Sequence, residues 1–145
     1  MPGRVIYLTR SWPRLSQTFI VGEVLALERR GVRLDIFALE PSGERLRQPQ
    51  VDRVTADVAY LEGAGGWREH HQVLAASPRE YLATAAFALR NPDLSSGYAT
   101  VTSWKCFSFA VHLARHVARV RAAGDTVSHV HAHFAHDPAL VALLL

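Results

Sequence analysis

The sequence is poor in cysteine and lysine and has no long apolar run. Cys106 is the only cysteine, so an intramolecular disulfide and a cysteine-based zinc site are both excluded, and we expect a reducing, cytoplasmic location. No apolar stretch approaches the roughly 18–20 residues that span a bilayer, and Arg10 interrupts the first one, which leaves no signal segment. Lys105 is the only lysine among sixteen cations, and a net charge of +3 is too mild to indicate a nucleic-acid partner.

The composition is that of one folded domain. The chain has 145 residues, of which 49% are hydrophobic and 20% charged, which excludes a disordered tail and a collagen-like repeat. Asp137-Pro138 predicts a helix start, with the Asp137 carboxylate as its cap. Seven apolar residues, 139–145, then follow without a polar face or a stop signal. We therefore expect 1–145 to be a domain truncated near its C-terminal end, with its last helix lacking the neighbours that should bury it.

Strand and helix patterns alternate along the chain and predict an α/β fold with a Rossmann-like parallel sheet. Ser16 is the expected N-cap of the first helix, and Gly31 its stop. The loop 40–53 is polar. We predict strands at 4–9, 32–39, 57–62 and 127–132, and helices at 16–30, 67–76, 78–89, 98–123 and from 137 onward.

The first loop that could hold a ligand follows the first strand. Arg14, Ser16, Gln17 and Thr18 lie just ahead of a helix N-terminus, where backbone N–H groups favour an anion or a sugar hydroxyl. The loop has neither the G-x-G-x-x-G pattern nor a P-loop, which disfavours a dinucleotide or Walker-type site. The alternative is a structural role as a cap and a turn.

The second loop carries four of the eight histidines, at positions 129, 131, 133 and 136. On an extended strand the first three share one side, and together they could bind Zn²⁺ or Ni²⁺. Same-side strand positions lie about 6.6–6.8 Å apart, so convergence on one ion needs a bend. We favour the alternative without a metal, in which His129 and His131 are partly buried and hydrogen-bonded and only His133 reaches the cleft.

The long helix at 98–123 carries His112, Arg115, His116 and Arg119 on one side. We expect a solvated face there; the alternative is contact with an anionic membrane surface. Cys106 lies on the apolar side of the same helix and is expected in the core.

Two segments resemble the N-terminal domain of family 4 (GT4) glycosyltransferases of the exopolysaccharide and colanic-acid type. One is 5–9 with Trp12-Pro13-Arg14-Leu15-Ser16-Gln17-Thr18-Phe19-Ile20, Glu23, Leu27 and Gly31; the other is His129-Val130-His131-Ala132-His133-Phe134-Ala135 with Asp137-Pro138-Ala139. Trp12 stands where the family usually has Phe and Gln17 where it has Glu, so a carboxylate role at 17 is not available. The middle of the chain, 40–125, shows no signature.

The resemblance implies the N-terminal half of a GT-B fold, with a C-terminal donor-binding domain outside this sequence. It implies transfer of a sugar, with retention, from a nucleotide-sugar to a saccharide or lipid-linked acceptor in cell-surface polysaccharide biosynthesis, with no cofactor and no metal. His133 is then the histidine that reaches the reacting sugar, with His131 as its rival. Arg14, Ser16, Gln17 and Thr18 line the cleft as substrate-binding residues. The alternative from another class is a non-enzymatic basic module that docks on anionic membranes, peripheral at the inner face of the plasma membrane.

Overall fold

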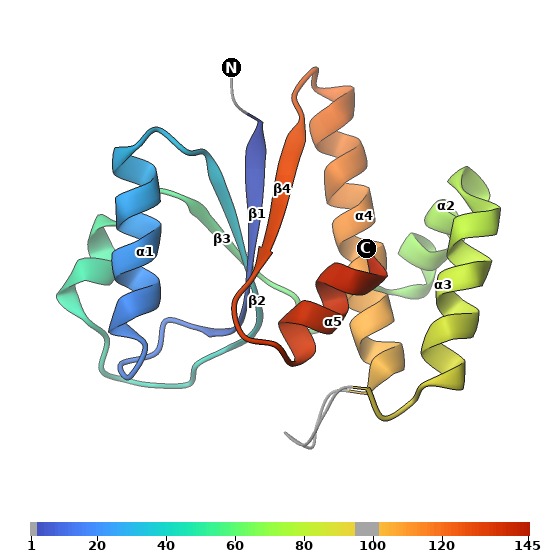
Figure 1. The fold of residues 1–145 in the computed structure, drawn as a ribbon, viewed down its shortest axis with the longest axis horizontal. Helices are drawn as coiled ribbons and strands as arrows, with labels where there is room; N and C mark the ends of the chain where they lie inside the picture. Colours follow the sequence, from blue (N-terminus) through green and yellow to red (C-terminus); the bar gives the residue numbers. More distant parts are fainter. Residues whose placement is uncertain (1–2, 95–101) are drawn as a thin grey trace.

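The computed structural model describes residues 3–94 and 102–145 and has helices on both faces of one sheet (Figure 1). In chain order the elements are β1 (Arg4–Trp12), α1 (Thr18–Arg29), β2 (Leu34–Pro41), the 3₁₀ turn η1 (Pro49–Arg53), β3 (Asp57–Tyr60), α2 (Trp67–Ala76), α3 (Pro78–Arg90), α4 (Ser103–Ala122), β4 (Val127–Ala132) and α5 (Asp137–Leu144).

The four strands form a parallel sheet in the order β3-β2-β1-β4. This confirms the predicted α/β, Rossmann-like fold. The order reverses between β1 and β4, because the chain moves outward from β1 to β3 and then returns to the other side of β1. In open α/β sheets ligands bind at such a switch point, outside the carboxyl ends of the strands. The carboxyl ends of β1 and β4 are therefore where a site is expected.

Each face of the sheet has its own apolar core. Tyr7, Ile36 and Ala38 point toward α1 and form one core with its buried side. Ile6 and Leu8 alternate with them and point toward α4 and α5, as the period of two along a strand requires. In Figure 1, α1 covers one face and α4 and α5 the other, with α2 and α3 packed outside α4. Both central strands are buried on both sides, as their continuous apolar runs predict.

The bounds of β2, β3, α2, α3 and β4 lie within two residues of their predictions, whereas other elements differ in their ends or caps. β1 runs on to Trp12 because Ser11 and Trp12 pair with Glu40 and Pro41. Ser16 is not the N-cap of α1: Gln17 precedes the helix, without a side-chain cap, after a turn in which the Gln17 N–H donates to the Arg14 carbonyl at 3.1 Å. The 3₁₀ turn η1 lies inside the loop predicted at 40–53. The predicted helix start at 98 lies outside the described residues, in which α4 begins at Ser103.

Helix α5 also differs from its prediction. Asp137 lies in the first turn of the helix and His136 precedes it, with no side-chain cap. The Asp137 carboxylate is buried and forms an ion pair with Arg10 at the end of β1 instead. Three of the apolar side chains that follow, Leu140, Val141 and Leu144, are buried in the core shared with α4. The expectation that this helix lacks burying neighbours is therefore wrong for these three, while Leu143 is exposed.

The polar side of α4 is not a solvated face. His112 Nδ1 lies 2.9 Å from the Glu69 carboxylate of α2, and Arg115 lies 3.4 Å from the same carboxylate. His116 Nε2 lies 2.9 Å from the Asp35 carboxylate of β2. The prediction was wrong because α2 and the end of the sheet supply carboxylates to this side, and Arg119 alone of the four is exposed.

Two further features concern α4. Cys106 is fully buried, as predicted, and burial raises the pKa of its thiol to about 12. Gly65 has φ +76°, and a Cβ atom built on it would lie 2.2 Å from the Ser108 carbonyl oxygen, so the turn that precedes α2 approaches α4 through a residue without a side chain. Among the described residues, no helix combines the length and the apolar content needed to cross a bilayer.

Candidate functional site

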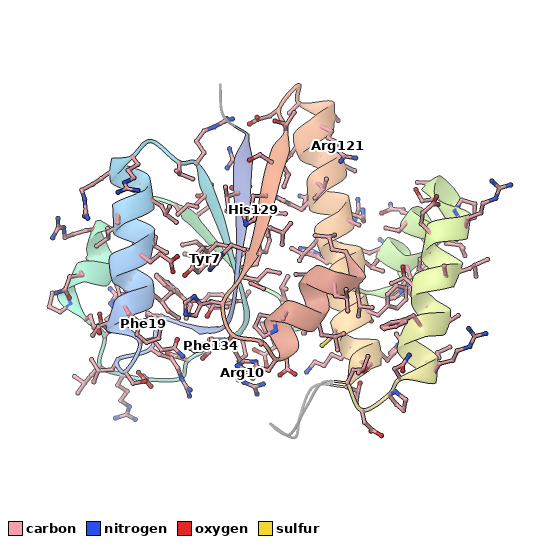
Figure 2. All side chains as sticks on the ribbon, viewed as in Figure 1. Tyr7, Arg10, Phe19, Arg121, His129 and Phe134 are labelled. Carbon is pink, nitrogen blue, oxygen red and sulfur yellow. The ribbon has the colours of Figure 1, made fainter. Side chains whose placement is uncertain are left out.

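The histidines of the second loop lie at the switch point, beside β1. In the parallel register Tyr7 of β1 pairs with His131 of β4, and both side chains point toward α1. Their rings stack with centroids 4.8 Å apart. Figure 2 shows Phe19, Phe134 and Arg10 gathered at the carboxyl end of the sheet, beyond Tyr7.

Tyr7, Glu23 and His133 form a hydrogen-bonded group near the carboxyl end of the sheet. The Tyr7 hydroxyl donates to Glu23 Oε2 at 2.7 Å and lies 3.2 Å from His133 Nδ1. A phenol has one proton, so a hydroxyl that donates to the carboxylate accepts from the imidazole. This assigns the ring proton of His133 to Nδ1 and leaves Nε2 as a hydrogen-bond acceptor.

Aromatic side chains from both loops pack on His133. Phe19, in the first turn of α1, lies 5.4 Å from the imidazole between ring centroids, and Phe134 lies edge-on at 4.6 Å. The two phenylalanines also meet each other at 6.2 Å. Phe134 adopts φ +73°, a left-handed conformation that is unusual for a residue with a side chain and is often found at functional sites. This conformation turns the chain sharply after His133.

The surroundings keep His133 and Tyr7 in their neutral forms. Burial lowers the pKa of His133, and the proximity of His131 lowers it further, while the Glu23 carboxylate opposes the shift. Burial raises the pKa of Tyr7, and so does its hydrogen bond to the Glu23 carboxylate. At neutral pH the imidazole is therefore uncharged and the phenol remains a donor.

The expectation of partly buried, hydrogen-bonded residues is wrong for His129 and is confirmed for His131 only in its partial burial. His129 is exposed. His131 is partly buried, but its Nε2 atom is buried without a hydrogen-bond partner among the described residues, and lies 4.0 Å from Glu23 Oε1. His133, expected to reach the cleft, is the less exposed of the two, at 18% of its side chain against 36% for His131.

No described contact joins the residues predicted in the first loop to these histidines. Arg14 is exposed and lies 3.8 Å from the Glu44 carboxylate. The Gln48 amide donates to the carbonyls of Arg14 and Leu15, and Ser16 borders a shallow hollow with the 44–46 segment. Gln17 flanks the helix and Thr18 is exposed. Among the described contacts, Phe19 is the residue that joins this loop to His133.

In the sequence analysis Tyr7 has no role, and Glu23 is named only within the first segment that resembles the family; the pattern of the helix that contains Glu23 offered more. That pattern was the available signal: Glu23 is a carboxylate among Ile20, Val24 and Leu27, and a charge on a buried stripe requires a partner. Tyr7 gives no such signal, because a tyrosine in a central strand is ordinary.

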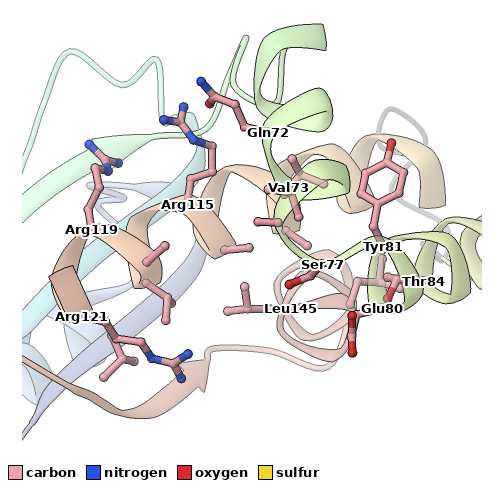
Figure 3. Close-up of a pocket in the computed structure, with 18 of the residues that line it drawn as sticks. Gln72, Val73, Ser77, Glu80, Tyr81, Thr84, Arg115, Arg119, Arg121 and Leu145 are labelled. Atoms are coloured by element: carbon pink, nitrogen blue, oxygen red, sulfur yellow. The ribbon is translucent and has the colours of Figure 1, made fainter.

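A larger pocket, of about 900 Å³, lies on the other face of the sheet, between α2, α3 and α4 (Figure 3). Arg115, Arg119 and Arg121 lie along one side of it, and Glu80 and Tyr81 along the other. Its polar groups stand at the rim around an apolar interior. The polar groups that converge on one place are those of Tyr7, Glu23, His131 and His133, which we take as the candidate site.

No family model, curated protein or solved structure matches the chain.

Proposed function

We propose that the chain is the acceptor-side, N-terminal domain of a retaining glycosyltransferase of family 4. One observation carries this proposal: the two segments that resemble the family lie far apart in the sequence, and Phe19 of the first packs against His133 and Phe134 of the second. They meet at the switch point, where open α/β sheets bind their ligands. In this proposal the Rossmann-like domain is one half of a GT-B enzyme.

His133 is the proposed catalytic residue. Its Nε2 atom, as an acceptor, receives a hydrogen bond from a hydroxyl of the reacting sugar, while Nδ1 is held by Tyr7. Tyr7 and Glu23 are positioning residues, because they fix the ring and its tautomer without reaching the substrate themselves. A neutral imidazole suits this role, since it orients a hydroxyl without attracting the donor phosphates. Placing the acceptor oxygen in this way removes part of the entropic barrier to transfer.

The donor in this proposal is a nucleotide diphosphate sugar, bound mainly by a second Rossmann-like domain encoded downstream. The acceptor is a saccharide or lipid-linked saccharide at the cytoplasmic side of the membrane, in cell-surface polysaccharide biosynthesis. Arg14, Ser16, Gln17 and Thr18 remain predicted substrate-binding residues. Their contact with substrate requires a ligand that bridges from the 14–18 segment to His133. The proposed reaction itself uses no cofactor.

The test uses the full-length protein and measures release of nucleoside diphosphate from a panel of nucleotide-sugars. We expect His133→Ala to lower turnover by at least about a hundredfold, because misplacement of a reacting group has that cost. His129→Ala, on the same strand and exposed, is the matched control and leaves turnover unchanged. Tyr7→Phe lowers kcat more than it raises KM, because it loosens a ring that acts in the reaction.

Two results would contradict the proposal, and a third would remove one residue role from it. The first is a full-length sequence without a second Rossmann-like domain that carries a Glu-x₇-Glu motif. The second is the lack of nucleoside diphosphate release from every donor tested. The third, which removes only the role of His133, is equal turnover of His133→Ala and the parent protein.

Contact with an anionic membrane stays a prediction, but the side of α4 that carries His112, Arg115 and His116 is not available as its basic surface. His112 and Arg115 face Glu69 and His116 faces Asp35, so these side chains are not a free basic face. Salt-sensitive co-sedimentation of the chain with anionic vesicles would support peripheral binding through other residues.

A further inference from the structure

We infer that Glu23, His131 and His133 form a binding site for a divalent metal ion of the zinc class. Each of the three side chains offers one ligand atom, and these atoms lie within 4.8 Å of one another. Two imidazoles and one carboxylate are a donor set that catalytic zinc sites use, with further positions left for water or substrate. The inference goes beyond the proposed function and concerns a different state of the site, because an ion on His133 Nδ1 displaces the hydrogen bond to Tyr7 on which the proposed catalytic role depends. Ion binding is measured without turnover, so the two proposals can fail separately.

The distances are close to those a bound ion requires. Zinc bonds of about 2.0–2.1 Å in a tetrahedron place two ligand atoms about 3.3–3.4 Å apart. Glu23 Oε2 lies 3.6 Å from His133 Nδ1, and Glu23 Oε1 lies 4.0 Å from His131 Nε2. These two distances end on different oxygens of the carboxylate, and the ligand atoms of the two imidazoles lie within 4.8 Å of each other. Side-chain rotations that shorten all three separations bring the three residues to one ion.

A second observation points to a missing partner at the same place. The Nε2 atom of His131 is buried and accepts or donates no hydrogen bond among the described residues. A buried polar atom without a partner costs on the order of 1–3 kcal/mol. The His131 Nε2 atom lies on the side of the ring that faces Glu23, and a cation bound there would use the lone pair of this nitrogen. The cation thus gives this nitrogen the partner that the protein does not supply.

The fold supplies the bend that three strand histidines alone would lack. β4 ends at Ala132, and the left-handed Phe134 turns the chain beyond it. The third ligand comes from α1 and not from His129, which remains exposed on the strand. The Tyr7 hydroxyl donates to Glu23 Oε2 and orients the carboxylate, as outer partners of metal ligands do.

Binding has one necessary consequence for His133. An ion held at Nδ1 takes the lone pair of an unprotonated nitrogen, so the ring proton moves to Nε2 and the hydrogen bond to Tyr7 is lost. The Glu23 and Tyr7 bond is retained. Because zinc in a tetrahedral site takes four ligands and this set supplies three, one position is left for an anionic or hydroxyl ligand.

The test is a titration of the purified chain with Zn²⁺ by calorimetry, with Co²⁺ as a spectroscopic probe. We expect one ion per chain and the visible absorption of four-coordinate Co²⁺. Glu23→Gln, His131→Ala and His133→Ala each weaken Zn²⁺ binding by at least tenfold, since loss of even an outer partner costs about 10–100-fold. His129→Ala is the matched control and keeps the parent affinity.

A measurement on the unmodified chain keeps the test valid if a variant fails to fold. In histidine ¹⁵N NMR spectra, Zn²⁺ should shift the ring nitrogens of His131 and His133 and move the His133 proton from Nδ1 to Nε2, with His129 unaffected. No stoichiometric Zn²⁺ binding would overturn the inference. So would equal losses of affinity in His129→Ala and Glu23→Gln, which would place the ion on the strand histidines alone.

Discussion

Replacing Tyr7 by phenylalanine tests whether the hydrogen-bonded group at the switch point stabilises the fold. The hydroxyl is on a fully buried side chain and donates to the Glu23 carboxylate at 2.7 Å. A hydrogen bond to a charged group contributes about 1.5–3 kcal/mol. Glu23 is 39% exposed, so water replaces part of the lost bond in the variant, and the expected loss is about 1.5 kcal/mol, at the lower end of that range.

The assay is urea unfolding followed by circular dichroism, together with thermal unfolding. For a chain of this size, a loss of about 1.5 kcal/mol lowers Tm by about 3–6 °C. Tyr60→Phe is the matched control: its hydroxyl donates to the Trp12 carbonyl at 3.2 Å, but the side chain is 43% exposed, so the expected change is below about 0.5 kcal/mol. Equal losses in both variants would refute the reasoning, because the buried bond would then contribute no more than a surface one.

Two further predictions concern the other side of the sheet and α2. Burial alone would raise the pKa of Asp35, but hydrogen bonds from Arg4 and His116 outweigh it and lower the pKa below its ordinary value of 3.8. A lowered pKa stabilises the fold above that ordinary value and the contribution is lost as the pH falls through the folded pKa, so Asp35→Asn should flatten the acid side of a plot of urea midpoint against pH. Gly65→Ala should cost at least about 2 kcal/mol in urea unfolding, because it combines a left-handed backbone with a clash against α4. Gly63→Ala, at φ +77° but in open space, should cost only the backbone part, about 1–2 kcal/mol; the reverse order would contradict the close approach of the turn before α2 to α4.

The predicted elements agree best where local signals coincide. The bounds of α2 match their prediction, since Gly66 precedes the helix and Ser77-Pro78 follows it. The bounds of β4 also match their prediction, because the local sequence Val127–Ala132 is itself typical of a strand. The start of α1 was wrong because its determinant is not local. The turn at Arg14 to Gln17 is held by Gln48, which is more than thirty residues away, so Ser16 does not reach the cap position.

The site was predictable in part. The histidine-rich strand end indicated the correct edge of the sheet, because parallel strands end together. The partners of those histidines come from β1 and α1, and only the folded arrangement brings Tyr7 and Glu23 to His133. The hydrogen-bond contacts of His112 and His116 with carboxylates have the same cause. Their carboxylates, Glu69 and Asp35, are distant in sequence, and charge spacing along one helix cannot reveal them.

The strand order also sets the timing of folding during synthesis. β1 is central, yet one of its two edges pairs with β4, with Val5 opposite His129. At about 5–20 residues per second, the ribosome leaves that edge of β1 without its partner for on the order of ten seconds. An unpaired edge of a strand as apolar as β1 invites pairing with other chains. The nascent protein is therefore most exposed to aggregation just before β4 emerges. Its dependence on chaperones should fall sharply once β4 has paired with β1.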